Sequence, residues 1–209
     1  MEIIDLISAT LSLLFLAYAS YSDLKTRKVD NKVWIMAVGC GLVLLLFKIE
    51  IYCLVSIVFM ILFAFLVYYL GVFLSNIHVL RGGIYGGADA KAIISLSILM
   101  PTWPFFSEYF PVFFSLSAVL NGAIISLLVP LAMFIYNAWK KKISFPQCFI
   151  AIPVKGKVAK EKWWIYAKKN GKTYVTPKIP FILFLLLGYI VSLVYGDLVS
   201  PLLFYLLGF

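Results

Sequence analysis

The sequence predicts an all-α polytopic membrane protein with six transmembrane helices and a small cytoplasmic lysine-rich segment before the last helix. Of its 209 residues, 64% are hydrophobic and 13% are charged, whereas about half of a soluble globular domain is apolar. A water-soluble fold of this size has too little interior for so many apolar side chains, so its solvent must be lipid. We expect residues 1–209 to form a single integral membrane domain, with 140–178 as a cytoplasmic insertion.

Six apolar runs account for the expected helices. They cover 3–21, 33–47, 51–74, 92–107, 111–139 and 179–196. Runs of roughly 20 residues cross a bilayer as helices, because a helix pairs its own backbone groups where no water is present. The first run begins with Glu2 and Asp5, not with the basic residues of a signal peptide, so we expect it to be retained. We expect Pro101 and Pro104 to end the fourth helix and Pro130 to kink the fifth.

The basic residues are clustered as membrane topology requires. Of 18 lysines and arginines, 17 fall in 22–32, 75–91 and 140–178, which hold 4, 2 and 11 of them. Cytoplasmic loops carry an excess of basic residues, so these loops face the cytoplasm and the N-terminus lies outside. On the outer side we expect acidic residues such as Asp5 and Asp197 to be solvated helix ends. The same clustering argues against a nucleic-acid-binding face.

The segment 140–178 is the sizeable water-exposed part of this topology. It interleaves 11 lysines with tryptophan and tyrosine residues, which favours binding to anionic lipid headgroups at the membrane surface. Asn170-Gly171, flanked by aromatic and β-branched residues, predicts a small hairpin. The three cysteines form no Cys-x-x-Cys pair, which argues against a disulfide framework and a zinc site.

Two aspartates, Asp23 and Asp89, lie at the ends of apolar runs and on the same, cytoplasmic, side of the predicted topology. A carboxylate at a bilayer boundary is costly, so it suggests a functional site. Two close aspartates are not both ionised cheaply, so such a pair shares one proton. The ionised member would then take a proton from water while the protonated one binds the scissile carbonyl. The pattern predicts a membrane-embedded aspartyl protease.

Other protease chemistries lack their residues in this sequence. The single histidine, His78, has no His-Glu-x-x-His motif around it, and no Gly-x-Ser-x-Gly is present. We expect His78 to line the loop after the third helix. Asp30, seven residues after Asp23, is an alternative catalytic candidate, but we expect it to be the N-cap of the next helix.

The sequence before Asp89 is rich in glycine. Four glycines fall within 82–87, and glycine permits the close backbone approach that an extended substrate needs at a buried carboxylate. We expect Gly86, Gly87 and Ala88 to position this loop and substrate; the alternative is a flexible interhelical turn. The lysines beside the aspartates either meet substrate charge or anchor the helix ends at the headgroups. These lysines are Lys25 and Lys91.

Two motifs carry a resemblance to a known family. Asp-Leu-Lys-Thr-Arg-Lys-Val-Asp-Asn at 23–31 and Gly-Gly-Ala-Asp-Ala-Lys at 86–91 resemble the motifs of type IV prepilin peptidases, which are Gly-x-Gly-Asp membrane aspartyl proteases. The lysine-rich segment and Val-Thr-Pro-Lys-Ile-Pro at 175–180 are most similar to the archaeal branch, the preflagellin (prearchaellin) peptidases. One departure is Ala88, which replaces the second glycine of Gly-x-Gly-Asp.

The resemblance implies an endopeptidase with Asp23 and Asp89 as its catalytic dyad. Bacterial members carry a zinc domain with two Cys-x-x-Cys pairs and also methylate their product. This sequence has neither pair, so the resemblance implies no metal, no cofactor and no methyl transfer. It implies an archaeal cell-membrane enzyme that removes the short basic leader of archaellin-like or pilin-like preproteins at the cytoplasmic face, ahead of their hydrophobic helix.

Two alternatives remain open. Presenilin-type intramembrane proteases are also Gly-x-Gly-Asp enzymes, but their Tyr-Asp and Pro-Ala-Leu motifs are missing here. A small transporter or ion-binding membrane protein would also use intramembrane carboxylates. A transporter is expected to show inverted repeats, and the sequence shows none.

Overall fold

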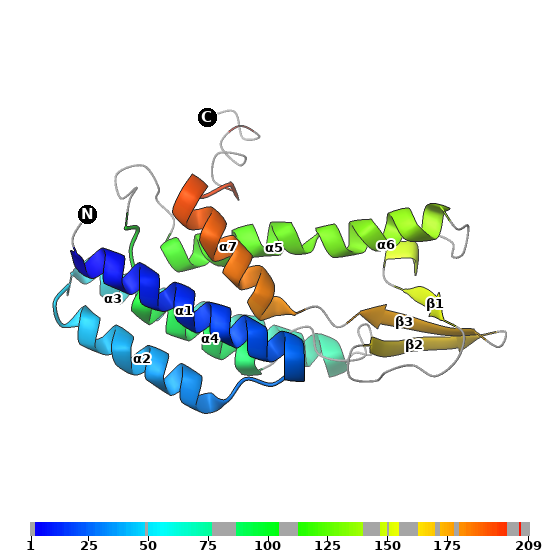
Figure 1. Cartoon of the computed structure of the whole chain (residues 1–209), viewed down its shortest axis with the longest axis horizontal. Helices are drawn as coiled ribbons and strands as arrows, with labels where there is room; N and C mark the ends of the chain where they lie inside the picture. The colour runs from blue at the N-terminus through cyan, green and yellow to red at the C-terminus, as the bar shows by residue number, and fades with distance from the viewer. Residues whose placement is uncertain are drawn as a thin grey trace.

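The computed structural model of the chain is mostly helical (Figure 1). It describes residues 3–48, 50–76, 87–104, 113–139, 147–149, 151–154, 163–169, 172–177, 180–199 and 205. The helices are α1 (Ile3–Thr26), α2 (Asn31–Leu45), α3 (Ile51–Asn76), α4 (Gly87–Leu99), α5 (Phe114–Ser126), α6 (Leu128–Trp139) and α7 (Phe181–Tyr195). A 3-10 turn, η1 (Gln147–Phe149), follows α6, and the strands are β1 (Ile152–Val154), β2 (Trp163–Lys169) and β3 (Lys172–Pro177).

Three helical stretches of the described chain are long and apolar enough to cross a membrane. They are Ile3–Thr26, Ile51–Phe73 and Phe114–Trp139. Helices α2 and α7 are apolar but have only 15 residues each, or about 22 Å at 1.5 Å per residue. The expectation of a mostly helical protein is confirmed, and three described helical stretches are candidate membrane spans; the predicted six spans are not confirmed.

The all-α prediction is too strict, because a three-stranded sheet lies in the lysine-rich segment. Its strand order is β1-β3-β2, and both pairings are antiparallel. The predicted hairpin is confirmed by the pairing of Lys169 with Lys172, although Asn170 and Gly171 lie outside the described residues. At β3, Val175 is fully buried.

The sheet lies beyond the end of α6 and the start of α7, on the side where α1 ends (Figure 1). Asn137, in the last turn of α6, connects it to the helices. The buried Asn137 amide donates to the carbonyls of Cys148 and Ala151, at 2.7 and 2.9 Å. Because these carbonyls belong to η1 and to the residue before β1, one side chain holds the start of the sheet against the helical part.

The prolines act as predicted at two helix boundaries. α4 ends at Leu99, ahead of Pro101 and Pro104. The fifth apolar run is interrupted at Leu127, between α5 and α6. Proline has no N–H and clashes with the carbonyl four residues earlier, which for Pro130 is that of Ser126, the last residue of α5. The break therefore falls one turn before the proline.

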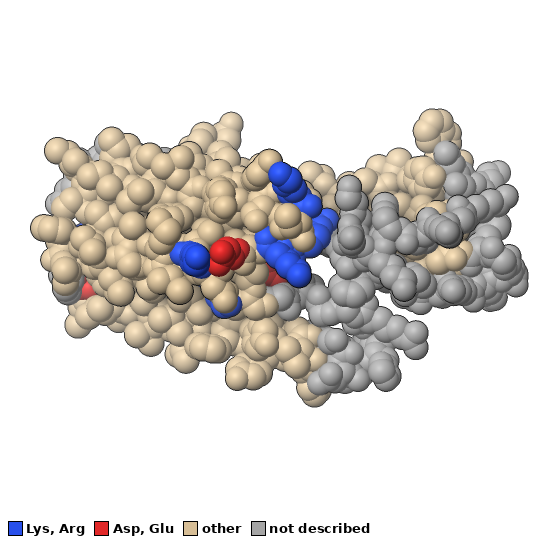
Figure 2. All heavy atoms as spheres, turned by 60° about the horizontal axis from the view of Figure 1, so that its bottom comes forward, with Lys and Arg blue, Asp and Glu red and all other residues tan. Residues whose placement is uncertain are grey.

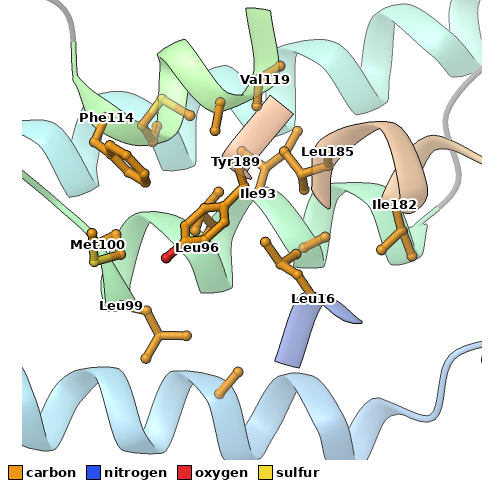
Figure 3. Close-up of a cluster of buried hydrophobic side chains, with 14 of the residues drawn as sticks. Leu16, Ile93, Leu96, Leu99, Met100, Phe114, Val119, Ile182, Leu185 and Tyr189 are labelled. Atoms are coloured by element: carbon orange, nitrogen blue, oxygen red, sulfur yellow. The ribbon is translucent and has the colours of Figure 1, made fainter. Parts of the chain in front are cut away.

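The core lies where α1, α4, α5 and α7 pack together, with α2 and α3 packed against α4. Figure 3 shows side chains of α1, α4, α5 and α7 meeting there. Aromatic rings form its centre. Phe114 packs edge-on against Trp103 and Tyr189, with ring centroids 5.1 and 5.4 Å apart. The buried Tyr189 hydroxyl donates to the carbonyl of Ala9 at 2.8 Å. The ring therefore fills the core while its hydroxyl ties α7 to α1.

Helices α5 and α7 approach each other closely at two glycines. A Cβ at Gly188 would lie 2.2 Å from the carbonyl oxygen of Ala118 and 2.3 Å from the nitrogen of Gly122. A Cβ at Gly122 would lie 2.5 Å from the carbonyl oxygen of Phe184. Both helices present backbone to backbone here, as is common where small residues bring membrane helices together. These positions have no room for a side chain.

Two acidic residues expected to be solvated are not. Asp197, just after α7, is 2% exposed, and its Oδ1 accepts from the N–H of Val199 at 3.0 Å. Asp5 forms an ion pair with Lys48, which ties the start of α1 to the end of α2. The expectation assumed that water would solvate these carboxylates. In the structure, a backbone N–H and a lysine ammonium group bind them instead.

Gly188→Ala is expected to destabilise the protein by about 2 kcal/mol or more, because overpacking against backbone forces the helices apart. Gly39→Ala is the matched control, since no atom lies within 4 Å of a Cβ at this exposed helical position and alanine is the better helix former. Thermal unfolding in detergent should show a lower Tm for Gly188→Ala alone. Equal Tm values for the two variants would contradict the close approach.

Candidate active site

Asp23 lies in the last turn of α1. Its side chain is 17% exposed, so it is largely covered but still reachable. The guanidinium of Arg27, one turn further on, lies 3.9 Å from its carboxylate. Arg27 has a φ of 56°, a left-handed conformation that is uncommon outside glycine. The chain therefore leaves the helix at Arg27, four residues after Asp23.

Side chains on the final turn of α1 hold this helix end. The hydroxyls of Ser22 and Thr26 both donate to the carbonyl of Lys28, at 2.8 and 2.9 Å. These bonds satisfy a carbonyl just beyond the helix end, where backbone groups lack helical partners. Asp23 therefore lies on a helix end whose following turn is held by hydrogen bonds.

Asp30 is the N-cap of α2, as predicted. Its backbone is extended, and its Oδ1 accepts from the N–H of Lys32 at 3.0 Å. Asp, Asn, Ser and Thr are favoured at this position because their oxygens bind the unpaired N–H groups of a helix start. Asp30 thus has a local structural task that accounts for its presence.

Asp89 lies in the first turn of α4, which begins at Gly87. Negative charge is favourable there because of the exposed N–H groups and the helix dipole. Ala88 packs against the hydrophobic core, whereas Gly87 is exposed with open space where a Cβ would be. The described residues do not include Gly82, Gly83 and Gly86, or His78. Their predicted positioning role stays a prediction.

Lys91, two residues after Asp89, has a partner on another helix. Its ammonium group donates to Oδ1 of Asn31 at 2.7 Å. Asn31 is the first residue of α2, directly after the Asp30 cap. This bond brings the start of α4 to the start of α2, and therefore to the end of α1 that carries Asp23. Lys25, by contrast, lies 5.7 Å above the ring of Tyr21 on its own helix.

Charges gather at this end of the helical part. Figure 2 shows acidic atoms flanked by Lys and Arg side chains, with mostly uncharged residues over the rest of the described part of this face. The acidic residues of this end are Asp23, Asp30 and Asp89, and the basic ones are Lys25, Arg27, Lys28, Lys32 and Lys91. Within the described ranges, no group of three or more His, Cys, Asp or Glu side chains is arranged to hold a metal ion.

Sequence reasoning missed Asn31 as a member of this site. As the first residue of α2, directly after its N-cap, Asn31 needs no further role to account for its presence. Nothing in the sequence predicts its bond to a lysine 60 positions away. The contact of Arg27 with Asp23, by contrast, could have been predicted from their spacing of four residues. An acidic and a basic residue at i and i+4 lie on one helix face.

The comparisons with known proteins agree with this picture. Residues 10–136 match the model of the type IV leader peptidase family, and residues 154–198 match the archaeal peptidase A24 C-terminus, type II. The first match spans more than half of the chain, so the protein belongs to the type IV leader peptidase family and is a protease.

Two archaeal relatives share its sequence at a moderate level. The chain is 26% identical to a preflagellin peptidase of Methanocaldococcus jannaschii, over 87% of this chain and 91% of the relative. It is 27% identical to a preflagellin peptidase of Methanococcus voltae, over 63% of this chain and 58% of the relative. The expected resemblance to the archaeal branch is thereby confirmed.

The bond between Lys91 and Asn31 gives a testable coupling. Lys91→Met and Asn31→Ala each remove it, so the double variant should be less destabilised than the sum of the singles. The coupling free energy should be about 0.5 kcal/mol, at the low end for a hydrogen bond, because this bond is exposed to water. Chemical unfolding in detergent measures it, and Lys25→Met paired with Asn31→Ala is the control. Strict additivity in the Lys91 cycle would show that the bond does not form.

Proposed function

We propose that this protein is an archaeal preflagellin or prepilin-like peptidase in which Asp23 and Asp89 form the catalytic dyad. The observation that carries the proposal is the placement of the two residues. Asp23 ends α1 and Asp89 begins α4, α1 and α4 pack together, and the Lys91–Asn31 bond holds the start of α4 at this end of the bundle. Family membership supports the reaction class.

The reaction would proceed by activation of water. One aspartate is ionised and the other protonated, because two close carboxylates share a single proton. The ionised carboxylate takes a proton from water as the oxygen attacks the scissile carbonyl carbon. The protonated carboxyl hydrogen-bonds the carbonyl oxygen as it becomes negative. Collapse of the tetrahedral intermediate breaks the C–N bond, and the leaving amine takes up the proton that the first aspartate removed from water, which restores the dyad.

The substrate would be a preprotein with a short basic leader followed by a hydrophobic helix. The names of both relatives point to preflagellins. The helix would enter the membrane beside the enzyme, which puts the peptide bond just ahead of it at the level of Asp23 and Asp89. The few acidic side chains of this mostly basic end would attract the basic leader only locally. The hydrophobic helix of the substrate would therefore determine which peptide bond reaches the dyad.

The proposed topology has six membrane spans with the N-terminus outside and the dyad at the cytoplasmic face. α1, α3 and the combined α5–α6 have the required length, and α2, α4 and α7 would be extended by their flanking residues. The basic loops then all face the cytoplasm. The sheet of the lysine-rich segment would lie on the same side, against anionic lipid headgroups.

Cleavage of a purified preprotein tests the substrate class. Wild-type protein in detergent or liposomes should shorten a preflagellin or a pilin-like preprotein by its leader, as mass spectrometry of the product shows. A preprotein whose hydrophobic helix is interrupted by two aspartates is the matched control, and it should not be cut. If wild type cuts neither natural preprotein, the substrate assignment is wrong.

Asp23→Asn and Asp89→Asn should each lower the cleavage rate by at least a thousandfold, because an amide neither takes the proton of water nor replaces the shared one. Asp30→Asn is the control, since asparagine caps a helix as well as aspartate does. It should retain near-normal rates. Circular dichroism and gel filtration establish that all three variants are folded. Normal activity of either dyad variant would remove that residue from the mechanism.

A further inference from the structure

Arg27 occupies a backbone position at which glycine is the usual residue. Its N–H donates to the carbonyl of Asp23 at 2.9 Å, which closes α1 as a single bond from the residue after the helix end. Its φ is 56°, and among the residues that the structure describes it is the one non-glycine with a positive φ. This conformation costs a residue with a Cβ free energy that glycine avoids. An arginine here therefore calls for an explanation beyond its backbone.

The side chain of Arg27 offers that explanation. Its Nη1 lies 3.9 Å from Oδ2 of Asp23, and the two side chains are 27 and 17% exposed. Because both are mostly covered, salt and water screen this pair less than a fully exposed one. Arg27 thus contacts the proposed catalytic aspartate through its backbone and through its side chain. Glycine at this position would keep the first contact and lose the second.

The other charged groups of this end lie on helices α2 and α4, which pack against α1. The Asp30 carboxylate caps α2, and the Lys91 ammonium group binds the first residue of α2. α7 also packs against α1, but Phe181–Tyr195 contains no residue that is charged near neutral pH. Within the described ranges, Arg27 is the cation within ion-pair distance of Asp23. The remaining charged residues described here are Lys25, Lys28, Lys32 and Asp89.

We propose that Arg27 is a positioning residue of the peptidase, which holds the Asp23 carboxylate ionised so that Asp23 takes the proton from water. The inference rests on the proposed function, which requires one ionised aspartate and leaves open which of the two it is. The start of α4 favours an ionised Asp89 through a partial charge of about one half, whereas Arg27 carries a full charge. Asp89 then keeps the shared proton and binds the scissile carbonyl.

Arg27→Gly separates this role from a structural one. If Arg27 only stabilised the end of α1, the Tm in detergent would fall. We expect no such fall, because glycine removes the unfavourable φ. Without the cation the ionised dyad is less stable, so the acid limb of kcat/KM for a purified preflagellin should move up by about one pH unit. The variant should lose about tenfold below both midpoints, since one pH unit is a factor of about ten, and little above them.

Two further variants are matched to Arg27→Gly. Arg27→Lys keeps a positive charge at the same backbone position and should restore most of the shift in the midpoint. Lys28→Gln removes one positive charge from the next, exposed residue. It should leave the midpoint unchanged at about 0.15 M salt, where the Debye length is about 8 Å.

Asp23→Asn is measured first, because it tests the proposed function separately. Cleavage by Asp23→Asn would refute the dyad and, with it, the role of Arg27. If Asp23→Asn is inert, an unchanged midpoint in Arg27→Gly, or an equal loss at every pH, would overturn the role of Arg27 and leave the dyad standing. Should Arg27→Gly not fold, Arg27→Gln removes the same charge and gives the same readout.

Discussion

Hydrocarbon offers no hydrogen-bond partner, so each polar group in the spanning part of this protein must be satisfied by the protein itself. The structure meets much of this constraint with bonds between helices, although the buried hydroxyls of Ser56 and Ser115 have no hydrogen-bond partner among the described residues. Tyr189 reaches the carbonyl of Ala9, and Ser20 reaches that of Ile182, so α7 is tied to α1 at two levels. Asn121 of α5 donates to Ser192 and to the carbonyl of Gly196, which closes the end of α7. These bonds fix which helices are neighbours, and apolar packing fills the space between them.

The same constraint decides where charge is tolerated. Asp23 lies at the end of α1 and Asp89 at the start of α4, where basic side chains are nearby. In the proposed topology this is also the level of the headgroups. At the opposite end, Asp5 is paired with Lys48, and Asp197 is buried among protein groups. Of the three acidic residues at the end where Lys and Arg gather, Asp30 caps α2, which leaves Asp23 and Asp89 as the candidates to act on a soluble reactant such as water.

Much of this could be read from the sequence, because hydropathy, proline and charge act locally. The apolar runs, the end of α4 before Pro101, the Asp30 cap and the β2–β3 hairpin all follow from residues within a few positions of each other. The third strand, β1, and the Lys91–Asn31 bond depend on residues far apart in the chain. So does the burial of Asp197. No local pattern encodes such contacts. The proposed catalytic role of the aspartates rested on their place at the ends of apolar runs and on a family motif.

The central claim is that the ends of α1 and α4 bring the two carboxylates together, and a cross-link tests it most directly. Cysteines at positions 23 and 89, in a variant without Cys40, Cys53 and Cys148, should form a disulfide under mild oxidation in the presence of substrate, since a disulfide needs Cα atoms within about 7 Å. Cysteines at positions 5 and 89, placed at opposite ends of the bundle, should not. Absence of the 23–89 disulfide with and without substrate, in a folded protein, would contradict the dyad.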